Sequence, residues 1–582
     1  MKKIILFLGI CLLASCRQTT SETEKPETTV APPAPLPTDF IEELWYKNSL
    51  VYSVDVEVFK DSDKDGVGDF RGMSQQLDYL KKLGVETIWL APFQPTPNLD
   101  DGYDTSDFYG IDPRLGTPQD FTDFMNQASQ RGIRVMMDLV TNHTSDQHPW
   151  FQQARRQKDS PYRSWYVWSK ERPEKWNTGM VFPGVQKSVW SYDSLAGEYY
   201  YHRFYESQPD LNMQNPAVQR EMRKVIRYWL DKGVAGFRVD AVPFLIEVAT
   251  PDFDPDKPQH QFDMITQLHQ YVQWHKRDAI LLGEANVDPK EQEPYFGKEG
   301  QGMQTMFNFF ANQHLFYALA TTEVSTLKKA LNETKSIPPT AQWATFLRNH
   351  DEIDLGRLSD EERGKVYAKF GPDSSMQLYD RGIRRRLAPM LGDPRLIKLA
   401  YSLLFSLPGM PVIRYGEEIG MGDDLSLEER LSVRTPMQWS NKIHGGFSEA
   451  AKAVRPVISA GPYRYSTVNV AAQQADSASL LNHITRLSSL RKQCPEVGWG
   501  KWEIIDTKSP HVLAIRYNWQ GRSLVMIHNF SPQPQQNQLH TDPKAGLKLV
   551  DLLAKSEKQI GADGNFSVDL PAYGFKWYRV KK

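Results

Sequence analysis

The stretch VAGFRVDAVP, residues 234–243, carries the clearest sign of the fold. Its apolar residues predict a buried strand, and Arg238 and Asp240 are two residues apart, so they lie on the same side of it. A helical pattern at 216–232 precedes this strand, and a second apolar run, AILLGEA, follows at 279–285. Strands that alternate with helices in this way indicate a parallel sheet built from βα repeats.

The same alternation extends in both directions along the chain. One of the helices opens with Thr117 followed by Pro118, which is a helix cap followed by a first-turn proline. Eight such repeats predict an α/β fold, a (β/α)8 TIM barrel, in which the chemistry lies at the C-terminal ends of the strands. The predicted strands are 49–59, 85–92, 133–140, 234–241, 279–285, 303–309, 342–349 and 410–415.

Two further parts interrupt or follow the predicted barrel. Residues 144–212 are rich in Trp, Tyr and Pro and show no clean period, which predicts a domain (B domain) inserted after the third strand. After a last helix at 477–493, short alternating strands with turn signals predict a C-terminal antiparallel β-sandwich domain at 496–582. The catalytic barrel then consists of residues 40–143 and 213–495.

The first 16 residues have the pattern of an export signal. Two lysines precede an apolar run that is too short to span a membrane as a mature helix. The run ends in LASC (13–16), which resembles the lipobox of bacterial lipoproteins and implies lipidation of Cys16. We therefore expect an exported lipoprotein that is anchored to a membrane. The sequence does not distinguish the periplasmic from the cell-surface side, and a plain secretory signal is the alternative. The polar, Pro-rich residues 17–39 are typical of a flexible linker.

Bulk composition excludes some classes of function. The net charge of −2 over 582 residues shows no excess of positive charge of the kind that nucleic-acid binding requires. Aromatic residues make up 12% of the chain; such a surplus often lines sugar sites, although large cores explain it equally well. Beyond Cys16 the only cysteine is Cys494, so the mature chain depends on its core for stability.

Acidic residues and histidines gather at the ends of the predicted strands. DLVTNH contributes Asp138 and His143, GEAN contributes Glu284, and FLRNHD contributes His350 and Asp351. Like charges in one cleft repel and raise each other's pKa. Three or more converging carboxylates therefore indicate an active site, whereas Asp138 taken alone is explained as well by a structural role.

In order and in position, these segments resemble the short conserved regions of glycoside hydrolase family 13, the α-amylase family. The resemblance covers residues 40–582 and implies Asp240 as the nucleophile, Glu284 as the acid/base and Asp351 as the transition-state stabiliser. The chemistry agrees, because a retaining glycosidase needs two carboxyl groups about 5–5.5 Å apart. Arg238 would keep Asp240 ionised, and burial in an apolar strand would keep Glu284 protonated.

The resemblance also implies how the sugar is held. His143 and His350 would donate hydrogen bonds to glucose hydroxyls, and Arg434 of VRTPMQWS is a further substrate-binding residue. In family members that act on a terminal glucose, the DDGYD motif closes the pocket. Asp100 would then hold a hydroxyl at the non-reducing end, and Tyr103 would stack under the ring. A closed pocket implies action on a terminal glucosyl unit, whereas an open cleft would imply internal cleavage of starch.

Further segments narrow the resemblance. SDQHPWFQQAR (145–155), GIRRRLAPML (382–391) and VRTPMQWS (433–440) look most like trehalose synthases, whereas DDGYD is shared with α-glucosidases and oligo-1,6-glucosidases. Trehalose synthase isomerises maltose to trehalose through a covalent β-glucosyl enzyme, with hydrolysis as a side reaction. This chain has Leu431 and Ser432 where the family usually has a polar turn, which bears on the loop beside the leaving-group site.

Two other functions stay open on the sequence. A secreted α-glucosidase or α-amylase-type hydrolase of maltooligosaccharides would use the same carboxylates, and export would suit it, so the motifs alone do not separate isomerase from hydrolase. A non-catalytic sugar-binding relative is opposed by the intact triad of Asp240, Glu284 and Asp351. The expected partners are thus maltose, maltooligosaccharides or trehalose.

Calcium is the expected ion, and no motif for an organic cofactor is present. DSDKDGVGDF (61–70) opens like an EF-hand loop, but Gly72 stands where that loop has its bidentate Glu. The segment follows a predicted strand, so we expect a fixed structural ion; an acidic turn without metal is the alternative. The expected ligands are Asp61, Asp63, Asp65, the carbonyl of Val67, and Asp69. The resemblance suggests a second calcium site at Asn142, Asp210 and Glu247, although Asp210 could instead cap a turn.

Overall fold

The computed structural model describes residues 43–540 and 547–581. The predicted signal peptide, Cys16 and the linker at 17–39 lie outside the described residues. Within the part of the chain that is described, no helix has both the length and the apolar character needed to cross a membrane.

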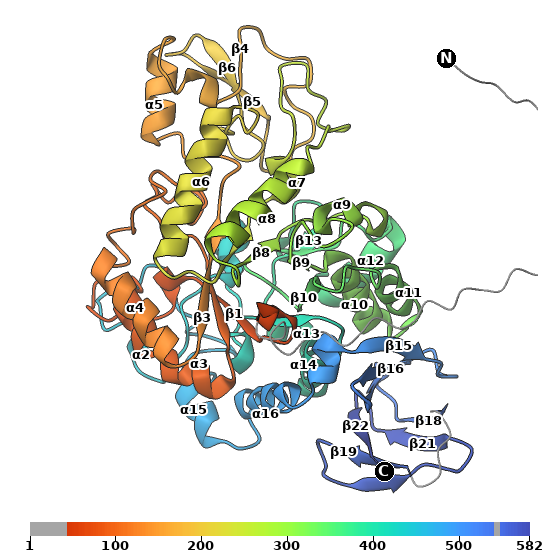
Figure 1. Ribbon diagram of the computed structural model, residues 1–582. Coiled ribbons are helices and arrows are strands. Elements are labelled where there is room, and N and C mark those ends of the chain that lie inside the picture. Colours follow the sequence, from red (N-terminus) through yellow and green to blue (C-terminus); the bar gives the residue numbers. More distant parts are fainter. Residues whose placement is uncertain (1–42, 541–546, 582) are drawn as a thin grey trace, which may run out of the picture. The chain divides into compact units, whose positions relative to one another are not determined.

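Eight parallel strands close into a barrel, as the βα rhythm predicts (Figure 1). They follow one another around the ring in chain order, and the last strand pairs with the first. Side chains such as Trp89, Met136 and Phe307 fill the barrel in one buried cluster, so the interior is a packed core. The strands are β1 (Val51–Val54), β2 (Thr87–Leu90), β3 (Arg134–Leu139), β7 (Gly236–Val239), β8 (Ile280–Gly283), β9 (Thr305–Phe307), β10 (Gln342–Phe346) and β14 (Met410–Arg414).

Helices follow the strands, and their caps agree with the sequence signals. The Thr117 side chain accepts a hydrogen bond from the backbone N–H of Asp120, and Asp120 reaches back to the cap, which completes a capping box. Residues 71–83, where the pattern of the sequence predicts a single helix, are instead two helices that meet at Gln76. The helices are α2 (Phe70–Gln75), α3 (Leu77–Leu83), α4 (Pro118–Gln130), α6 (Pro216–Asp231), α8 (Asp263–His275), α10 (Phe309–Thr321), α11 (Ser325–Glu333), α14 (Pro394–Ser406) and α16 (Leu480–Lys492).

The first strand is shorter than its apolar pattern suggests. The alternation runs to residue 59, but β1 ends at Val54 and a 3-10 turn spans Val56–Val58. Val56, Val58 and Phe59 are buried in that turn. The apolar pattern therefore predicted the burial of residues 56–59 correctly, but its prediction of an extended backbone there was wrong.

Two excursions leave the barrel on its C-terminal side. The predicted one after β3 contains α5 (Pro149–Arg156) and a three-stranded antiparallel sheet of β4 (Trp168–Ser169), β6 (Glu198–Tyr201) and β5 (Trp190–Asp193). A second excursion after β10, which the sequence reasoning missed, has α12 (Asp360–Phe370) and a small sheet of β11 (Ile353–Asp354), β13 (Gly382–Ile383) and β12 (Gln377–Leu378). Its strands have two residues each, so no periodicity could show them.

The C-terminal part is antiparallel, as predicted. A six-stranded sheet and a two-stranded ribbon share one apolar cluster that includes Val525, Ile527 and Phe566, which gives the sandwich arrangement. The sheet consists of β15 (Lys501–Ile505), β16 (Val512–Trp519), β17 (Arg522–Asn529), β22 (Phe575–Lys581), β19 (Lys548–Asp551) and β20 (Glu557–Gln559), and the ribbon of β18 (Gln535–His540) and β21 (Asn565–Leu570).

Candidate active site

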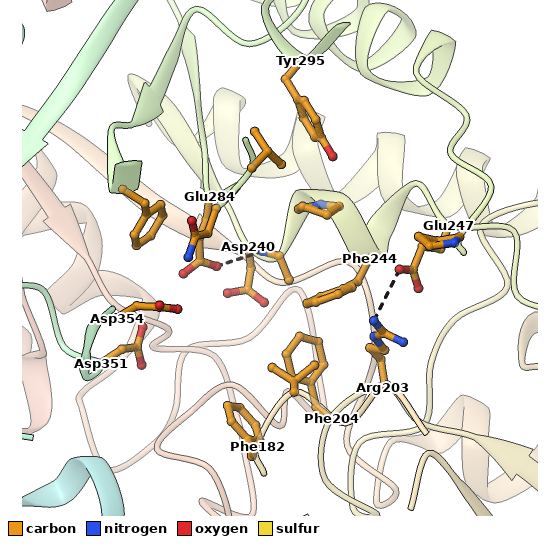
Figure 2. Close-up of a pocket in the computed structure, with 18 of the residues that line it drawn as sticks. Phe182, Arg203, Phe204, Asp240, Phe244, Glu247, Glu284, Tyr295, Asp351 and Asp354 are labelled. Carbon is orange, nitrogen blue, oxygen red and sulfur yellow. Dashed lines mark hydrogen bonds and ion pairs between the residues drawn. The ribbon is translucent and has the colours of Figure 1, made fainter. Parts of the chain in front are cut away.

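One buried guanidinium group organises the carboxylates at the mouth of the barrel. Arg238 Nη1 lies 2.5 Å from Asp240 Oδ1 and 2.6 Å from Asp138 Oδ1, and its Nη2 lies 2.7 Å from Glu284 Oε1. These residues come from the ends of β7, β3 and β8, which are neighbours in the barrel. In Figure 2 the carboxylates of Asp240 and Glu284 face each other. A single arginine that binds both carboxylates holds them on the same side of the site, next to one another.

The backbone after Asp240 also serves the site. Ala241 has a positive φ of 49°, a conformation that is unfavourable for a residue with a Cβ. In this conformation its N–H donates a hydrogen bond to Glu284 Oε2 at 3.0 Å. The strained backbone of Ala241 therefore helps to fix the orientation of Glu284 beside Asp240.

Burial raises the pKa values of Asp240 and Glu284 to different extents. It raises the pKa of Asp240 to about 6, although Arg238 acts in the opposite direction. Burial raises the pKa of Glu284 further, to about 7, again against Arg238. Near neutral pH, Asp240 is mostly ionised while much of Glu284 carries a proton. This is the division between nucleophile and acid/base that the sequence predicts.

Asp351, in the loop five residues after β10, stays charged. Burial acts to raise its pKa, but His350, Arg430, Arg434 and Arg238 outweigh burial and hold this pKa well below its usual range. Because burial keeps the pKa of His350 far below its ordinary value, His350 is neutral near pH 7. The arginines therefore supply the positive charge that keeps Asp351 ionised.

The site is closed at one end by a second ion pair. Arg430 Nη2 lies 2.6 Å from Asp100 Oδ1, and its Nη1 lies 3.0 Å from Asp351 Oδ1. Gln208 donates a hydrogen bond to Asp100 Oδ2 at 3.0 Å. Asp100 is thus held at the closed end by two partners, consistent with the pocket that DDGYD implies.

The histidines and the tyrosine predicted to bind sugar are in the same place. Tyr103 OH lies 2.7 Å from His350 Nε2, and the two rings are stacked with centroids 5.4 Å apart. His143 Nε2 lies 3.1 Å from the carbonyl oxygen of Tyr103, and burial lowers the pKa of His143 to about 4. Both histidines are therefore neutral near pH 7, and all three residues line the cavity described next.

The carboxylates open into a cavity of about 880 Å³, a size typical of small-ligand sites. Figure 2 shows Phe182, Phe204 and Phe244 along one side of it. Aromatic faces together with a few convergent polar groups are the usual lining of such a site.

The structure changes the roles of two arginines. Arg434, predicted to bind substrate, lies behind Asp351: its Nη2 is 3.1 Å from Asp351 Oδ1 and its Nη1 is 2.7 Å from Asp101. Arg430, which the sequence reasoning did not single out, lines the cavity in its place. It belongs to the short 3-10 helix Glu429–Val433, which brings it to Asp100. The only available signal was its position next to the unusual Leu431.

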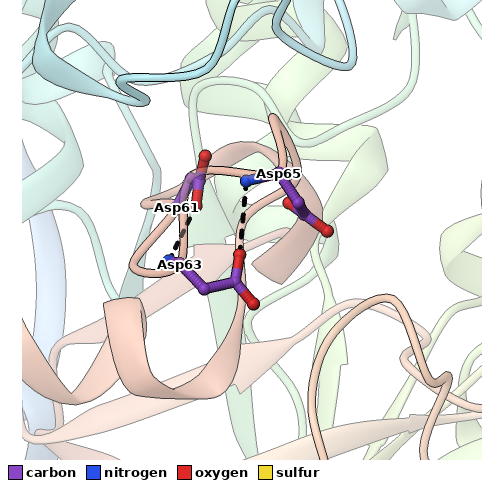
Figure 3. Close-up of side chains that lie close together, drawn as sticks. All are labelled: Asp61, Asp63 and Asp65. Atoms are coloured by element: carbon purple, nitrogen blue, oxygen red, sulfur yellow. Dashed lines mark hydrogen bonds between the residues drawn. The ribbon is translucent and has the colours of Figure 1, made fainter.

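The acidic loop after β1 brings three of its predicted ligands together. Oxygens of Asp61, Asp63 and Asp65 lie within 4.8 Å of one another (Figure 3). Asp69 is used differently: its two oxygens accept hydrogen bonds from Ser62 and from the backbone N–H of Gly72, so it caps α2. Hard carboxylate oxygens at this spacing suit Ca²⁺.

Two of the three residues of the predicted second metal site, Asn142 and Asp210, are in contact. Asn142 Nδ2 lies 3.2 Å from Asp210 Oδ2, and Glu247 Oε1 lies 3.7 Å from Arg203 Nη2 (Figure 2). Burial raises the pKa of Asp210 to about 8 and that of Glu247 to about 7, because the one nearby guanidinium compensates them incompletely. Buried oxygens with uncompensated negative charge fit a bound cation.

Comparison with known proteins decides the family. Residues 54–369 and 383–500 match the family described as alpha amylase, catalytic domain. The chain belongs to glycoside hydrolase family 13, the α-amylase family. Residues 521–579 match a sucrose hydrolase-like C-terminal domain, which agrees with a separate β domain at this end.

Relatives within family 13 narrow the identification. The chain is 39% identical to the trehalose synthase/amylase TreS of Mycolicibacterium smegmatis, over 94% of each chain. It is 31% identical to the oligo-1,6-glucosidase of Parageobacillus thermoglucosidasius, over 84% of this chain and 91% of the relative. The structure of trehalulose synthase MutB from Pseudomonas mesoacidophila superposes with a TM-score of 0.73 at 26% identity, covering 94% of this chain and all of MutB. This family 13 member is therefore a trehalose-synthase-like enzyme, with the oligo-1,6-glucosidases as more distant relatives.

Proposed function

We propose that the enzyme isomerises maltose to trehalose through a covalent β-glucosyl intermediate on Asp240, with some hydrolysis. The observation that carries this proposal is the ion pair of Arg430 and Asp100 in the wall of the cavity, which supports a pocket that takes a terminal glucosyl unit. The similarity to trehalose synthases over most of the chain supports the same reaction.

We propose a separate role for each of the three carboxyl groups. In the first step Asp240 attacks the anomeric carbon, the glycosidic C–O bond breaks, and Glu284 gives its proton to the departing oxygen. In the second step the anomeric hydroxyl of the released glucose attacks the same carbon, the bond to Asp240 breaks, and Glu284 takes up the proton. Asp351, kept ionised by Arg430 and Arg434, stabilises the positive charge that develops on the sugar in both transition states.

Water would replace the glucose in the second step of a hydrolase, so exclusion of water sets the balance between the two reactions. A secreted α-glucosidase of maltooligosaccharides is the second candidate, favoured by the export signal in the sequence and by the oligo-1,6-glucosidase relatives. Incubating the purified protein with maltose and quantifying trehalose against free glucose separates the two. Abundant glucose without trehalose would refute the isomerase.

We also propose that the enzyme holds structural Ca²⁺. Asp61, Asp63 and Asp65 would bind one ion, and Asn142, Asp210 and Glu247 a second, with backbone carbonyls completing each set. Such ions would neutralise the clustered carboxylates and fix the loop after β1 and the start of the excursion after β3.

An N-terminal lipid anchor is proposed from the sequence alone. The ending LASC at 13–16 supports attachment of lipid to Cys16 and a membrane-bound location outside the cytoplasm. Detergent-phase partitioning of the protein expressed in a bacterial host tests this. The wild type should enter the detergent phase and Cys16→Ala should not; equal partitioning of both would contradict the anchor.

A further inference from the structure

Glu429 joins three parts of the chain beside the active site. Its Oε2 accepts hydrogen bonds of 2.5 Å from Tyr205 OH and from Tyr379 OH, and the two hydroxyl groups lie 3.2 Å apart. Tyr205 belongs to the excursion after β3 and Tyr379 to the excursion after β10, whereas Glu429 lies in the loop after β14. Hydrogen bonds to a charged acceptor are about twice as strong as neutral ones. These three side chains therefore form a clasp between the two excursions and the loop.

The clasp fixes the position of Arg430, which is the next residue in the chain after Glu429. Arg430 pairs with Asp100 at 2.6 Å, and its guanidinium carbon lies over the ring of Phe182, 4.9 Å from the ring centroid. The Phe182 ring packs in turn on Tyr205 and on Tyr379, with centroids 4.8 Å apart in both pairs. Arg430 is thus held between its carboxylate partner and an aromatic group that the clasp keeps together.

The backbone is strained on both sides of the clasp. Glu429 has a φ of 39°, Tyr379 has a φ of 57°, and its neighbour Asp380 has a φ of 56°. Residues with a Cβ keep such angles only where their surroundings impose them, and these places are often sites that bind or switch. Arg384, which follows β13, donates a hydrogen bond of 2.9 Å to the carbonyl oxygen of Glu429. Both the backbone and the side chain of Glu429 are therefore fixed by the chain around β12 and β13.

The clasp lies outside the active-site cavity and borders another one. None of its three residues lines the active-site cavity. Glu429 and Tyr205 line a second cavity, of about 1020 Å³, which shares Asp100 and Arg430 with the first. The clasp therefore acts on the active site through Arg430, whose ion pair with Asp100 borders both cavities.

We propose that Glu429 is a positioning residue that favours transfer of the glucosyl group to sugar over its transfer to water. The inference rests on the proposed function. With the clasp closed, Arg430 stays against Asp100, and the released glucose is the acceptor for the glucosyl group on Asp240. With the clasp open, Arg430 is free to move, and water from the second cavity competes for that group.

The products formed from maltose test this proposal. In Glu429→Ala we expect the trehalose-to-glucose ratio to fall about tenfold and KM for maltose to rise about fivefold, while kcat for maltose consumption stays within about threefold. Glu429→Gln keeps an acceptor oxygen without the charge and should show a smaller loss. The variants should fold, because the two excursions still meet where Arg381 Nη1 donates to the carbonyl oxygen of Val181 at 2.7 Å.

The two tyrosines test whether the clasp acts as one unit. Tyr205→Phe and Tyr379→Phe each remove one hydrogen bond to Glu429, so each should lower the trehalose-to-glucose ratio about threefold. In the Glu429→Ala background neither substitution should have a further effect, because the bond it removes is already lost.

Tyr79 supplies the matched control. Tyr79 OH and Tyr52 OH both donate hydrogen bonds of 2.7 Å to Glu418 Oε1, which is buried and lines neither cavity. Tyr79→Phe therefore removes the same kind of bond from another pair of tyrosines on one glutamate. It should lower the Tm without changing the trehalose-to-glucose ratio or KM.

Three results would overturn the proposal: a wild-type ratio and KM in Glu429→Ala, a further loss when the Phe substitutions are added to it, or a change of the ratio in Tyr79→Phe as large as in Tyr379→Phe. If Glu429→Ala does not fold, the comparison of Tyr379→Phe with Tyr79→Phe decides. If the wild type releases glucose alone, the proposed isomerisation fails and KM for maltose hydrolysis decides instead. Glu429→Ala should still raise this KM about fivefold, and an unchanged KM would refute the role of the clasp.

Discussion

Arg430 and Asp100 form an ion pair at 2.6 Å at the closed end of the active site, although 330 residues separate them in the chain. The same guanidinium group reaches Asp351 at 3.0 Å. One side chain therefore contacts both Asp100 in the wall of the pocket and the carboxylate that we propose stabilises the transition state. Substrate choice and catalysis are coupled through Arg430.

Removing this arginine should impair both properties. Arg430→Ala removes the guanidinium group that Asp100 and Asp351 share, and leaves Asp100 only Gln208 and Asp351 only its remaining neighbours such as Arg434. Breaking a buried ion pair costs about 3–5 kcal/mol. We expect kcat/KM for maltose to fall about 100-fold, and the glucose-to-trehalose ratio to rise because water enters the active site more easily. Arg395→Ala is the control, since it breaks an exposed arginine–aspartate pair and should change kinetics by less than about twofold. Unchanged maltose kinetics in Arg430→Ala would contradict the role of the pair.

The plot of kcat/KM against pH should be bell-shaped. Asp240, with a pKa of about 6, must be ionised to attack, so kcat/KM falls as the pH drops below this value. Glu284, with a pKa of about 7, must be protonated to act as the acid, so activity falls as the pH rises above it. We expect the maximum between these values, with both limbs belonging to the coupled pair.

An aryl α-glucoside with a good leaving group isolates the alkaline limb. Its departure needs no proton, so Glu284→Gln should retain much of the first step with this substrate and lose the fall at high pH. A persistent alkaline limb in that variant would show that another group is the acid.

Arg238 should determine the pH at which kcat/KM falls on the acid side of the profile. Among the described residues it is the one cation that contacts Asp240 and Glu284 together, so Arg238→Gln removes the group that favours their ionised forms. We expect the acid limb of kcat/KM to move to higher pH and the maximal rate to fall about 100-fold or more. Arg386→Gln removes an equally buried arginine, paired with Glu417 outside the cavity, and should lower stability without moving the limb. A limb at the same pH in both variants would refute this account.

Chelation should destabilise the protein. Bound Ca²⁺ stabilises the folded state by about 2.7 kcal/mol when its free concentration is 100 times Kd. We expect EDTA to lower the Tm by about 2 °C or more, added Ca²⁺ to restore it, and Asp63→Asn to reduce the response. Asp78→Asn, an exposed aspartate on α3, should respond to EDTA as the wild type does. A Tm that chelator leaves unchanged would count against both ions.

The barrel and its catalytic carboxylates were predictable because their signals are local. Each strand is a short buried run. Asp240 and Glu284 follow directly after β7 and β8, and Asp351 stands five residues after the end of β10, so the topology brings them to the same end of the barrel. The pairing of Arg238 with Asp240 also follows from their spacing on β7. These features need only the period of a strand and the rule that barrel chemistry lies at the strand ends.

The closed end was harder to predict because it is built from irregular backbone. Arg430 reaches the pocket because the loop that carries it is held from outside: Arg384 binds the carbonyl oxygens of Leu425, Leu427 and Glu429. Those contacts cross tens of residues and leave no periodic trace. The same holds for the excursion after β10, whose strands are too short to show a pattern.

The most direct test of the central claim is to trap the intermediate. 5-Fluoro-α-D-glucosyl fluoride forms a glucosyl ester on the nucleophile of a retaining α-glucosidase and slows its turnover, so the adduct can be weighed by mass spectrometry. We predict a mass gain of one fluoroglucosyl unit, located on the peptide that contains Asp240, and no gain in Asp240→Ala. An adduct on a different carboxylate, or rapid turnover of maltose by Asp240→Ala, would contradict the account.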